Sequence, residues 1–149
     1  IIMRLCLVIP VFTIFFASSA YAKCEDGSKT LFSCTTQKGK KIEVCDAQKT
    51  IQYSFGKPQR KPEIVLSIPR NQVSTYQWNG MGSHISYSVN VPNGNTVYNV
   101  FYAMDRLTEE HSIEAGVNVI INGKQIATVQ CLEKNLVANL EGVDLKLAE

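Results

Sequence analysis

The chain has few of the residues from which catalytic sites are usually built. Its 149 residues include only 2 histidines and 1 tryptophan. The sequence contains no G-x-S-x-G, H-E-x-x-H or G-x-x-x-x-G-K motif, which are typical of serine hydrolases, zinc peptidases and phosphate-binding loops. We therefore expect no enzymatic activity, no cofactor and no metal ion.

An excess of one charge is also lacking. The formal net charge at pH 7 is +2, and the isoelectric point is near 8.3. Nucleic-acid-binding domains usually carry a larger and more concentrated positive charge, so bulk charge gives no reason to expect a nucleic-acid partner. With 45% hydrophobic residues, the chain can bury a core, and its length fits one domain.

The apolar stretch near the N-terminus is too short for a membrane-spanning helix. Residues 5–16 are almost wholly apolar, follow Arg4, and precede small residues that end at Ala22. A span needs roughly 20 apolar residues, whereas this order of segments is typical of a secretory signal peptide. We expect residues 1–22 to be cleaved and residues 23–149 to form a single exported β domain with no membrane span.

Four of the five cysteines follow the signal peptide, and their spacing does not suit zinc. Zinc sites usually contain two cysteines two to four residues apart, a pattern that is missing here. In a small exported domain, an even number of cysteines indicates disulfide bonds. We expect two, formed by Cys24, Cys34, Cys45 and Cys131. Their pairing stays open, although a two-residue turn at residues 39–40 would place Cys34 opposite Cys45.

Short runs of β-branched and aromatic residues alternate with turn signals along the mature chain. The expected strands cover residues 30–36, 41–46, 50–56, 63–68, 72–78, 84–91, 96–104, 117–121 and 124–131, the last two joined by a turn at 122–123. They predict an all-β fold, either a single antiparallel sandwich or a small barrel of about seven to nine strands. Residues 105–116 could instead carry one helical turn, and residues 132–149 a short helix or a final strand.

The Asn93-Gly94 pair gives the most specific prediction of strand register. As a two-residue hairpin loop, it pairs Val91 with Thr96. The alternation of side chains then places Val89 on an apolar face and Ser88 on a polar face. Val89 is therefore predicted to be buried, and Ser88 to be solvated.

Two stretches carry residue types that are common in protein–protein contacts. Residues 105–114 contain four carboxylates and one arginine, so they would attract a basic partner. Tyrosine and tryptophan beside a glycine-rich stretch are the aromatic residues that dominate binding hot spots. The candidate partner contacts are Asp105, Glu109, Glu110, Glu114, Tyr76 and Trp78.

Basic residues gather at two of the predicted turns. They are Lys38, Lys40 and Lys41 in the first turn, and Lys57, Arg60 and Lys61 in a later loop that contains prolines. Basic loop ends of this kind suit anionic lipids or polymers. The simpler interpretation is that they keep the turns soluble.

The segment CTTQKGKKIEVCDAQKTIQYSFG, residues 34–56, together with the later Asn-Gly-Lys turn and strand cysteine, resembles a group of small exported β-proteins of Gram-negative bacteria. More distantly, the Cys-x4-Gly-Lys-Lys hairpin resembles the periplasmic c-type lysozyme inhibitors. This second resemblance implies a small antiparallel barrel whose S-x-S-G-x-x-Y loop enters the lysozyme cleft. Residues 82–87, GSHISY, depart from that loop's spacing, so no site residue is carried over.

These observations predict a periplasmic or secreted binding protein of a Gram-negative bacterium, with a protein as its partner. Its most specific form would be an inhibitor or immunity protein against an envelope-attacking hydrolase. A structural or adhesive envelope component that self-associates through an exposed strand edge is the alternative. An envelope-acting enzyme would require Glu109, Glu110 or Glu114 to converge with His84 or His111.

The signal peptide and the cysteine count yield the first testable prediction. The mature chain should begin at Lys23 and contain no free thiol, because paired cysteines oxidise in exported proteins. Intact mass spectrometry of the exported protein, alkylated before and after reduction, measures both properties. Uptake of alkyl groups by the unreduced protein would contradict the prediction.

Overall fold

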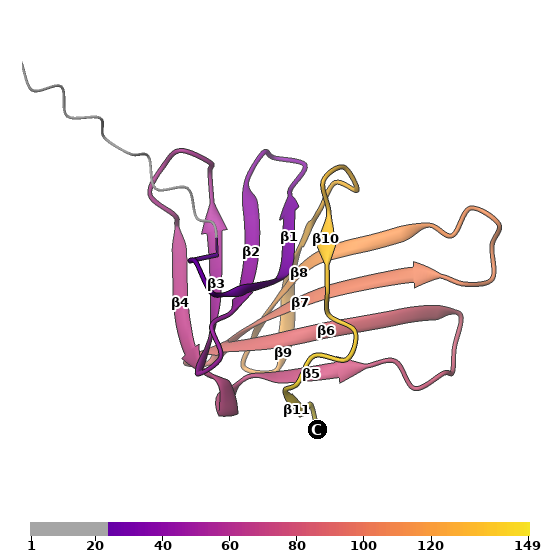
Figure 1. The fold of residues 1–149 in the computed structure, drawn as a ribbon. Helices are drawn as coiled ribbons and strands as arrows, with labels where there is room; N and C mark the ends of the chain where they lie inside the picture. Colours follow the sequence, from indigo (N-terminus) through magenta and orange to yellow (C-terminus); the bar gives the residue numbers. More distant parts are fainter. Residues whose placement is uncertain (1–23) are drawn as a thin grey trace, which may run out of the picture.

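The computed structural model describes residues 24–149, so the predicted signal peptide and Lys23 lie outside the described residues. The described chain forms 11 β-strands arranged in two sheets that pack face to face (Figure 1). The predicted all-β sandwich is thus confirmed, with more strands than expected. Within residues 24–149, no helix is long and apolar enough to cross a membrane.

The two sheets divide the strands into a group of five and a group of six. The first sheet has the order β10-β1-β2-β3-β4 and comprises β1 (Lys29–Thr35), β2 (Lys41–Asp46), β3 (Thr50–Gly56), β4 (Ile64–Pro69) and β10 (Val137–Ala138). The second has the order β11-β5-β6-β7-β8-β9 and comprises β5 (Ser74–Gln77), β6 (His84–Asn93), β7 (Thr96–Asp105), β8 (Ile113–Ile121), β9 (Lys124–Gln130) and β11 (Lys146–Leu147). A 3-10 turn (Arg70–Gln72) links the two sheets.

The core lies between the sheets, where inward-facing apolar side chains of both meet. Its fully buried members include Phe32, Ile42, Val44, Ile51 and Tyr53 from the first sheet and Val89, Val91, Val100 and Val117 from the second. The rings of Tyr53 and Tyr98 stack across the sandwich with centroids 4.9 Å apart. The pKa of Tyr53 is raised above its usual range, mainly by burial and to a lesser extent by the nearby Tyr98, so its hydroxyl stays protonated.

The β6–β7 hairpin turns at residues 94–95, so the register predicted from Asn93-Gly94 was wrong by two positions. Asn93 pairs with Thr96, and Val91 pairs with Tyr98. Because side chains alternate with a period of two, this shift leaves the same residues on each face. The predicted faces are therefore correct although the predicted pairs are not.

Burial on the two faces of β6 only partly follows the expectation. Val89 is fully buried, as predicted. Ser88, expected to be solvated, is only 8% exposed. It pairs with Tyr76 on one neighbouring strand and Phe101 on the other, and large flanking side chains of this kind cover a small serine.

The disulfides join Cys24 to Cys45 and Cys34 to Cys131. The pairing of Cys34 with Cys45 considered from the sequence is wrong, because Cys34 lies opposite Ile42 in the β1–β2 register. The turn that sets this register spans residues 36–40 rather than residues 39 and 40 alone. The second disulfide fastens the first sheet to the chain that leaves β9, and each bond stabilises the fold by roughly 2–4 kcal/mol.

The strands of the second sheet run across those of the first, and this crossing leaves part of the second sheet uncovered (Figure 1). Five strands spaced about 4.8 Å apart make the first sheet roughly 19 Å wide, whereas ten-residue strands such as β6 and β7 are roughly 33 Å long. The far ends of β6, β7 and β8 consequently extend past β10 (Figure 1). We call this projecting end, residues 78–87 and 102–115, the tip.

A ladder of side-chain hydrogen bonds crosses the outer face of the second sheet. Asn118 donates to Asn99 at 3.1 Å, Asn99 donates to Asn90 at 2.7 Å, and Asn90 donates to Ser74 at 3.2 Å. Thr128 donates to Asn118 at 2.7 Å and extends the ladder to the edge strand. Since each asparagine both donates and accepts, the ladder favours one register of the β5–β9 strands.

The centre of β8 yields a stability prediction. A Cβ on Gly116 would overlap the carbonyl oxygen of Val129 on β9, so Gly116→Ala should lower the free energy of unfolding by about 3 kcal/mol. Gly94→Ala is the control: its φ is +61° and nothing lies within 4 Å, so only backbone strain of about 1 kcal/mol is expected. Urea denaturation compares the two, and equal midpoints would show that β9 does not approach β8 this closely.

Candidate functional site

Two loops lie side by side at the tip and are joined by Arg106. The guanidinium of Arg106 sits over the Trp78 ring, 5.3 Å from its centroid, and its Nη1 donates to the carbonyl oxygen of Gly82 at 3.3 Å. The backbone N–H of Arg106 donates to the carbonyl oxygen of Ser83 at 3.0 Å. The indole N–H of Trp78 donates to Met81 O at 2.7 Å. These contacts hold the β5–β6 loop against the β7–β8 loop.

The acidic β7–β8 loop is shaped by bonds to Asp105. One oxygen of its carboxylate accepts the N–H of Leu107 at 2.9 Å, and its backbone N–H donates to Ser112 O at 2.9 Å. The backbone carbonyl of Asp105 also lies 3.0 Å from Nδ1 of His111. Hydrogen bonding to the carboxylate, above all from Leu107, holds the pKa of Asp105 below its usual value despite some desolvation. Asp105 therefore stays negatively charged well below neutral pH.

The structure brings together most of the predicted contact residues, but not all of them. Asp105 ends β7, and Glu109 and Glu110 lie exposed in the turn that follows. Glu114 lies within β8 and points to the outer face, where it pairs with Ala103. The segment 105–116, for which one helical turn was considered, forms a loop and then the start of β8.

The two predicted aromatic contacts lie on opposite faces of the second sheet. Trp78 lies at the tip, beside Arg106. Tyr76 is 45% exposed, but it pairs with Ser88 on the outer face. Only Trp78 therefore shares a surface with the inner face of the tip.

A groove of about 400 Å³ lies on the inner face of the tip. It is lined by Trp78, Ile85, Tyr87, Tyr102, Met104, Ala138 and Glu141. The lining from β6 and β7 continues the same alternation that buries Val89 and Val100 further along these strands. The pKa of Tyr87 is raised, mainly by desolvation and to a lesser extent by its hydrogen bond to Glu141. Sequence reasoning assigned this apolar face but did not identify it as open to a partner.

The histidines make local contacts at the tip. His84 Nδ1 shares a hydrogen bond with Ser83 Oγ at 2.8 Å, and His111 contacts the backbone of Asp105. Among residues 24–149, no described hydrogen bond joins either imidazole to Glu109, Glu110 or Glu114.

A second cluster, away from the tip, brings Cys24, Glu43 and Cys45 within 4.8 Å of one another. Both sulfur atoms are bonded to each other, so the oxidised cluster offers no thiolate to a metal ion. Glu43 is only 4% exposed, and its carboxylate lies 2.9 Å from Nζ of Lys41. The cluster is therefore a disulfide beside a buried carboxylate whose lysine partner is partly exposed.

Comparisons with models of protein families, with curated protein sequences and with solved structures find no match to this chain.

The contact between Arg106 and Trp78 can be tested by fluorescence, because Trp78 is the single tryptophan. Arg106→Gln should shift its emission to longer wavelength and increase quenching by acrylamide, since the ring loses its cover. The free energy of unfolding should fall by no more than about 1 kcal/mol, as expected for an exposed cation–π contact. Lys124→Gln, at an exposed position on β9, should leave the spectrum unchanged. An unchanged spectrum in Arg106→Gln would show that the guanidinium does not cover the Trp78 ring.

Proposed function

We propose that the mature chain is an exported binding protein that engages a basic protein partner through the tip. The observation that carries this proposal is the meeting of an acidic loop, a fixed tryptophan and an apolar groove at one projecting end. Protein interfaces commonly combine an aromatic centre with a charged rim. The two disulfides and the signal-like N-terminal segment favour the periplasm or the extracellular space.

The charge of the tip indicates the chemistry of the partner. Asp105, Glu109, Glu110 and Glu114 carry negative charge, whereas the single cation, Arg106, is directed onto Trp78 and a backbone carbonyl. A negative rim speeds encounter with positively charged proteins and disfavours negatively charged ones. Hydrolases that attack bacterial envelopes are often basic, because their substrates and target surfaces are anionic. The sharpest form of the proposal is an inhibitor or immunity protein against such a hydrolase.

The shape of the tip suits obstruction of a cleft. The ends of β6, β7 and β8 project beyond the first sheet (Figure 1), so they can enter a concave site while the bulk of the sandwich stays outside. The loops are joined by Arg106 and braced by hydrogen bonds. A partner would therefore meet a preorganised surface, which lowers the entropic cost of binding.

An exposed strand edge supports a second candidate, a self-associating envelope component. β9 is an edge of the second sheet, residues 124–128 are exposed, and Ile126 is 56% exposed. Unpaired N–H and C=O groups of an edge strand can bond to a second copy. A β-bulge interrupts the β8–β9 register between Val119 and Ile120, and such bulges protect edges from pairing. The tip is therefore the better-supported surface.

Surface plasmon resonance against a panel of basic muramidases and amidases tests the proposed function. Glu109→Gln combined with Glu110→Gln should slow association several-fold, because charges on an interface rim act mainly on the association rate. Glu25→Gln combined with Asp26→Asn removes the same charge from an exposed turn elsewhere and should bind like the unmodified protein. Association should also slow as salt rises, since the Debye length falls from ~10 Å at 0.1 M to ~3 Å at 1 M.

Two results would contradict this account. If no member of the panel binds, the proposal of an inhibitor or immunity protein is contradicted. An association rate that changes neither with salt nor in the Glu109→Gln, Glu110→Gln variant would show that the binding site lies away from the acidic rim.

A further inference from the structure

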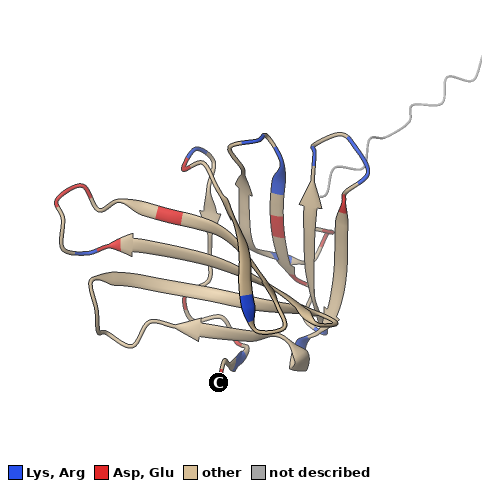
Figure 2. Cartoon of the chain, turned by 180° about the vertical axis from the view of Figure 1, so that it is seen from behind, with Lys and Arg blue, Asp and Glu red and all other residues tan. Residues whose placement is uncertain are grey.

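Three loops lie in a row at one end of the first sheet: the β1–β2 turn, the β3–β4 loop and the segment between β9 and β10 (Figure 1). Lysine and arginine are concentrated on these loops, whereas the acidic residues of the second sheet lie at the tip (Figure 2). We call this row the basic end; its cations are Lys38, Lys40, Lys41, Lys57, Arg60, Lys61 and Lys134.

Ion pairing neutralises only part of the basic end. Lys40 lies 2.8 Å from the Glu63 carboxylate and covers the Phe55 ring, while Lys41 pairs with the buried Glu43. Among the described residues, no ion pair involves the other five cations of the basic end, all of which are exposed: Lys38, Lys57, Arg60, Lys61 and Lys134. Glu133, also exposed, lies next to Lys134 in the same segment, so the basic end presents a net positive charge to solvent.

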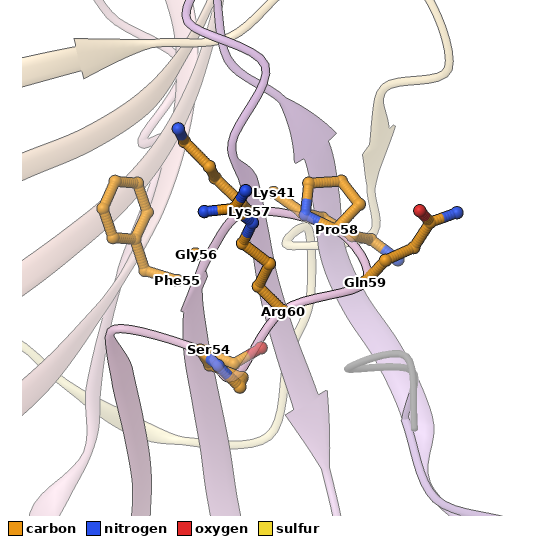
Figure 3. A pocket seen from close by; sticks show the side chains of 9 residues that line it. Lys41, Ser54, Phe55, Gly56, Lys57, Pro58, Gln59 and Arg60 are labelled. Carbon is orange, nitrogen blue, oxygen red and sulfur yellow. The ribbon is translucent and has the colours of Figure 1, made fainter. Parts of the chain in front are cut away.

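Small hollows beside these cations do not suit an enclosed ligand. Lys41, Lys57 and Arg60 gather around a depression beside Phe55 (Figure 3), which offers only about 20 Å³. A space of that size holds about one water molecule. A wider hollow of about 280 Å³ opens beside Lys38, with both polar and apolar neighbours such as Gln130 and Val129, and it is smaller than the roughly 300–1,000 Å³ of most ligand pockets. The geometry favours contact between loop ends and the headgroups of an extended anionic surface.

The side chains at the basic end also argue against a nucleic-acid partner. Sites for single-stranded nucleic acids combine positive charge with exposed aromatic rings on which bases stack. Phe55, the aromatic side chain that lines the depression, is already covered by Lys40. Positive charge on adjacent loops, of which the β3–β4 loop contains Pro58 and Pro62, is complementary to a surface of anionic headgroups.

We propose that the basic end docks the protein onto membranes that carry anionic lipids. The contact is peripheral and electrostatic, made by Lys38, Lys57, Arg60, Lys61 and Lys134. The tip lies on a different side of the molecule (Figure 2), so it stays accessible while the basic end is docked. This inference is independent of the proposed function, because it uses a different surface and a different partner.

Co-sedimentation with lipid vesicles tests the proposal. The mature protein should bind vesicles of phosphatidylcholine mixed with phosphatidylglycerol, but not vesicles of phosphatidylcholine alone. Lys57→Gln, Arg60→Gln and Lys61→Gln together should lower the partition coefficient on the order of 100-fold, because each cation near an anionic surface contributes about fivefold. The matched control neutralises three exposed lysines outside the basic end, Lys49, Lys124 and Lys146, and should bind within about twofold of the unmodified protein.

Several outcomes would overturn the docking proposal. Binding that does not depend on phosphatidylglycerol would show that the contact is not electrostatic. Binding that falls equally in both triple variants would show that the basic end is not the docking surface. Binding to heparin or oligodeoxythymidine without binding to vesicles would assign the surface to a soluble polymer. If the loop variant fails to fold by circular dichroism, release of the unmodified protein from the vesicles by high salt decides instead. No hydrolase is present in this assay, so its failure leaves the proposed function untouched.

Discussion

The narrowness of the first sheet limits how much of the second sheet can be buried. Strands of roughly 33 Å cross a layer roughly 19 Å wide, so the apolar faces of β6 and β7 cannot all lie in the core. The same alternation that buries Val89 and Val100 places Tyr87 and Tyr102 in an open groove. The groove is therefore a direct consequence of strand length and strand crossing.

Two kinds of fastening keep this arrangement in place. The disulfide between Cys34 and Cys131 ties β1 to the chain that leaves the second sheet. At the opposite side, Arg70 pairs with Asp46 at 2.6 Å and also donates to the carbonyl oxygen of Asp144 at 2.7 Å. Desolvation raises the pKa of Asp46, but hydrogen bonds from Arg70 and from the Gln48 N–H together outweigh it and keep that pKa below its usual value. The sandwich is thus closed at both sides, while the tip projects freely and carries the acidic loop.

Local chemistry explains which features were predictable. The bounds of β2 and β3 follow from short apolar runs, and the turn at Asn122-Gly123 follows from two residues that tolerate positive φ. The register predicted for β6 and β7 was wrong because the hydrophobic pattern cannot detect a shift of two residues, which leaves the same side chains on each face. The predicted disulfide pairing was wrong because it depended on the assumed length of one turn. Acidic residues and Trp78 were identifiable as contact candidates from their type. The groove was not, because it depends on how far a distant sheet extends.

The central claim is that the tip is the surface at which a basic protein binds. Hydrogen–deuterium exchange of the mature protein, with and without a basic muramidase that binds it, tests this claim most directly. The account predicts slower exchange in residues 78–85 and 104–112, with the loops of the basic end and strand β9 unchanged. Protection confined to β9 or to the basic end, with the tip exchanging at its free rate, would contradict it.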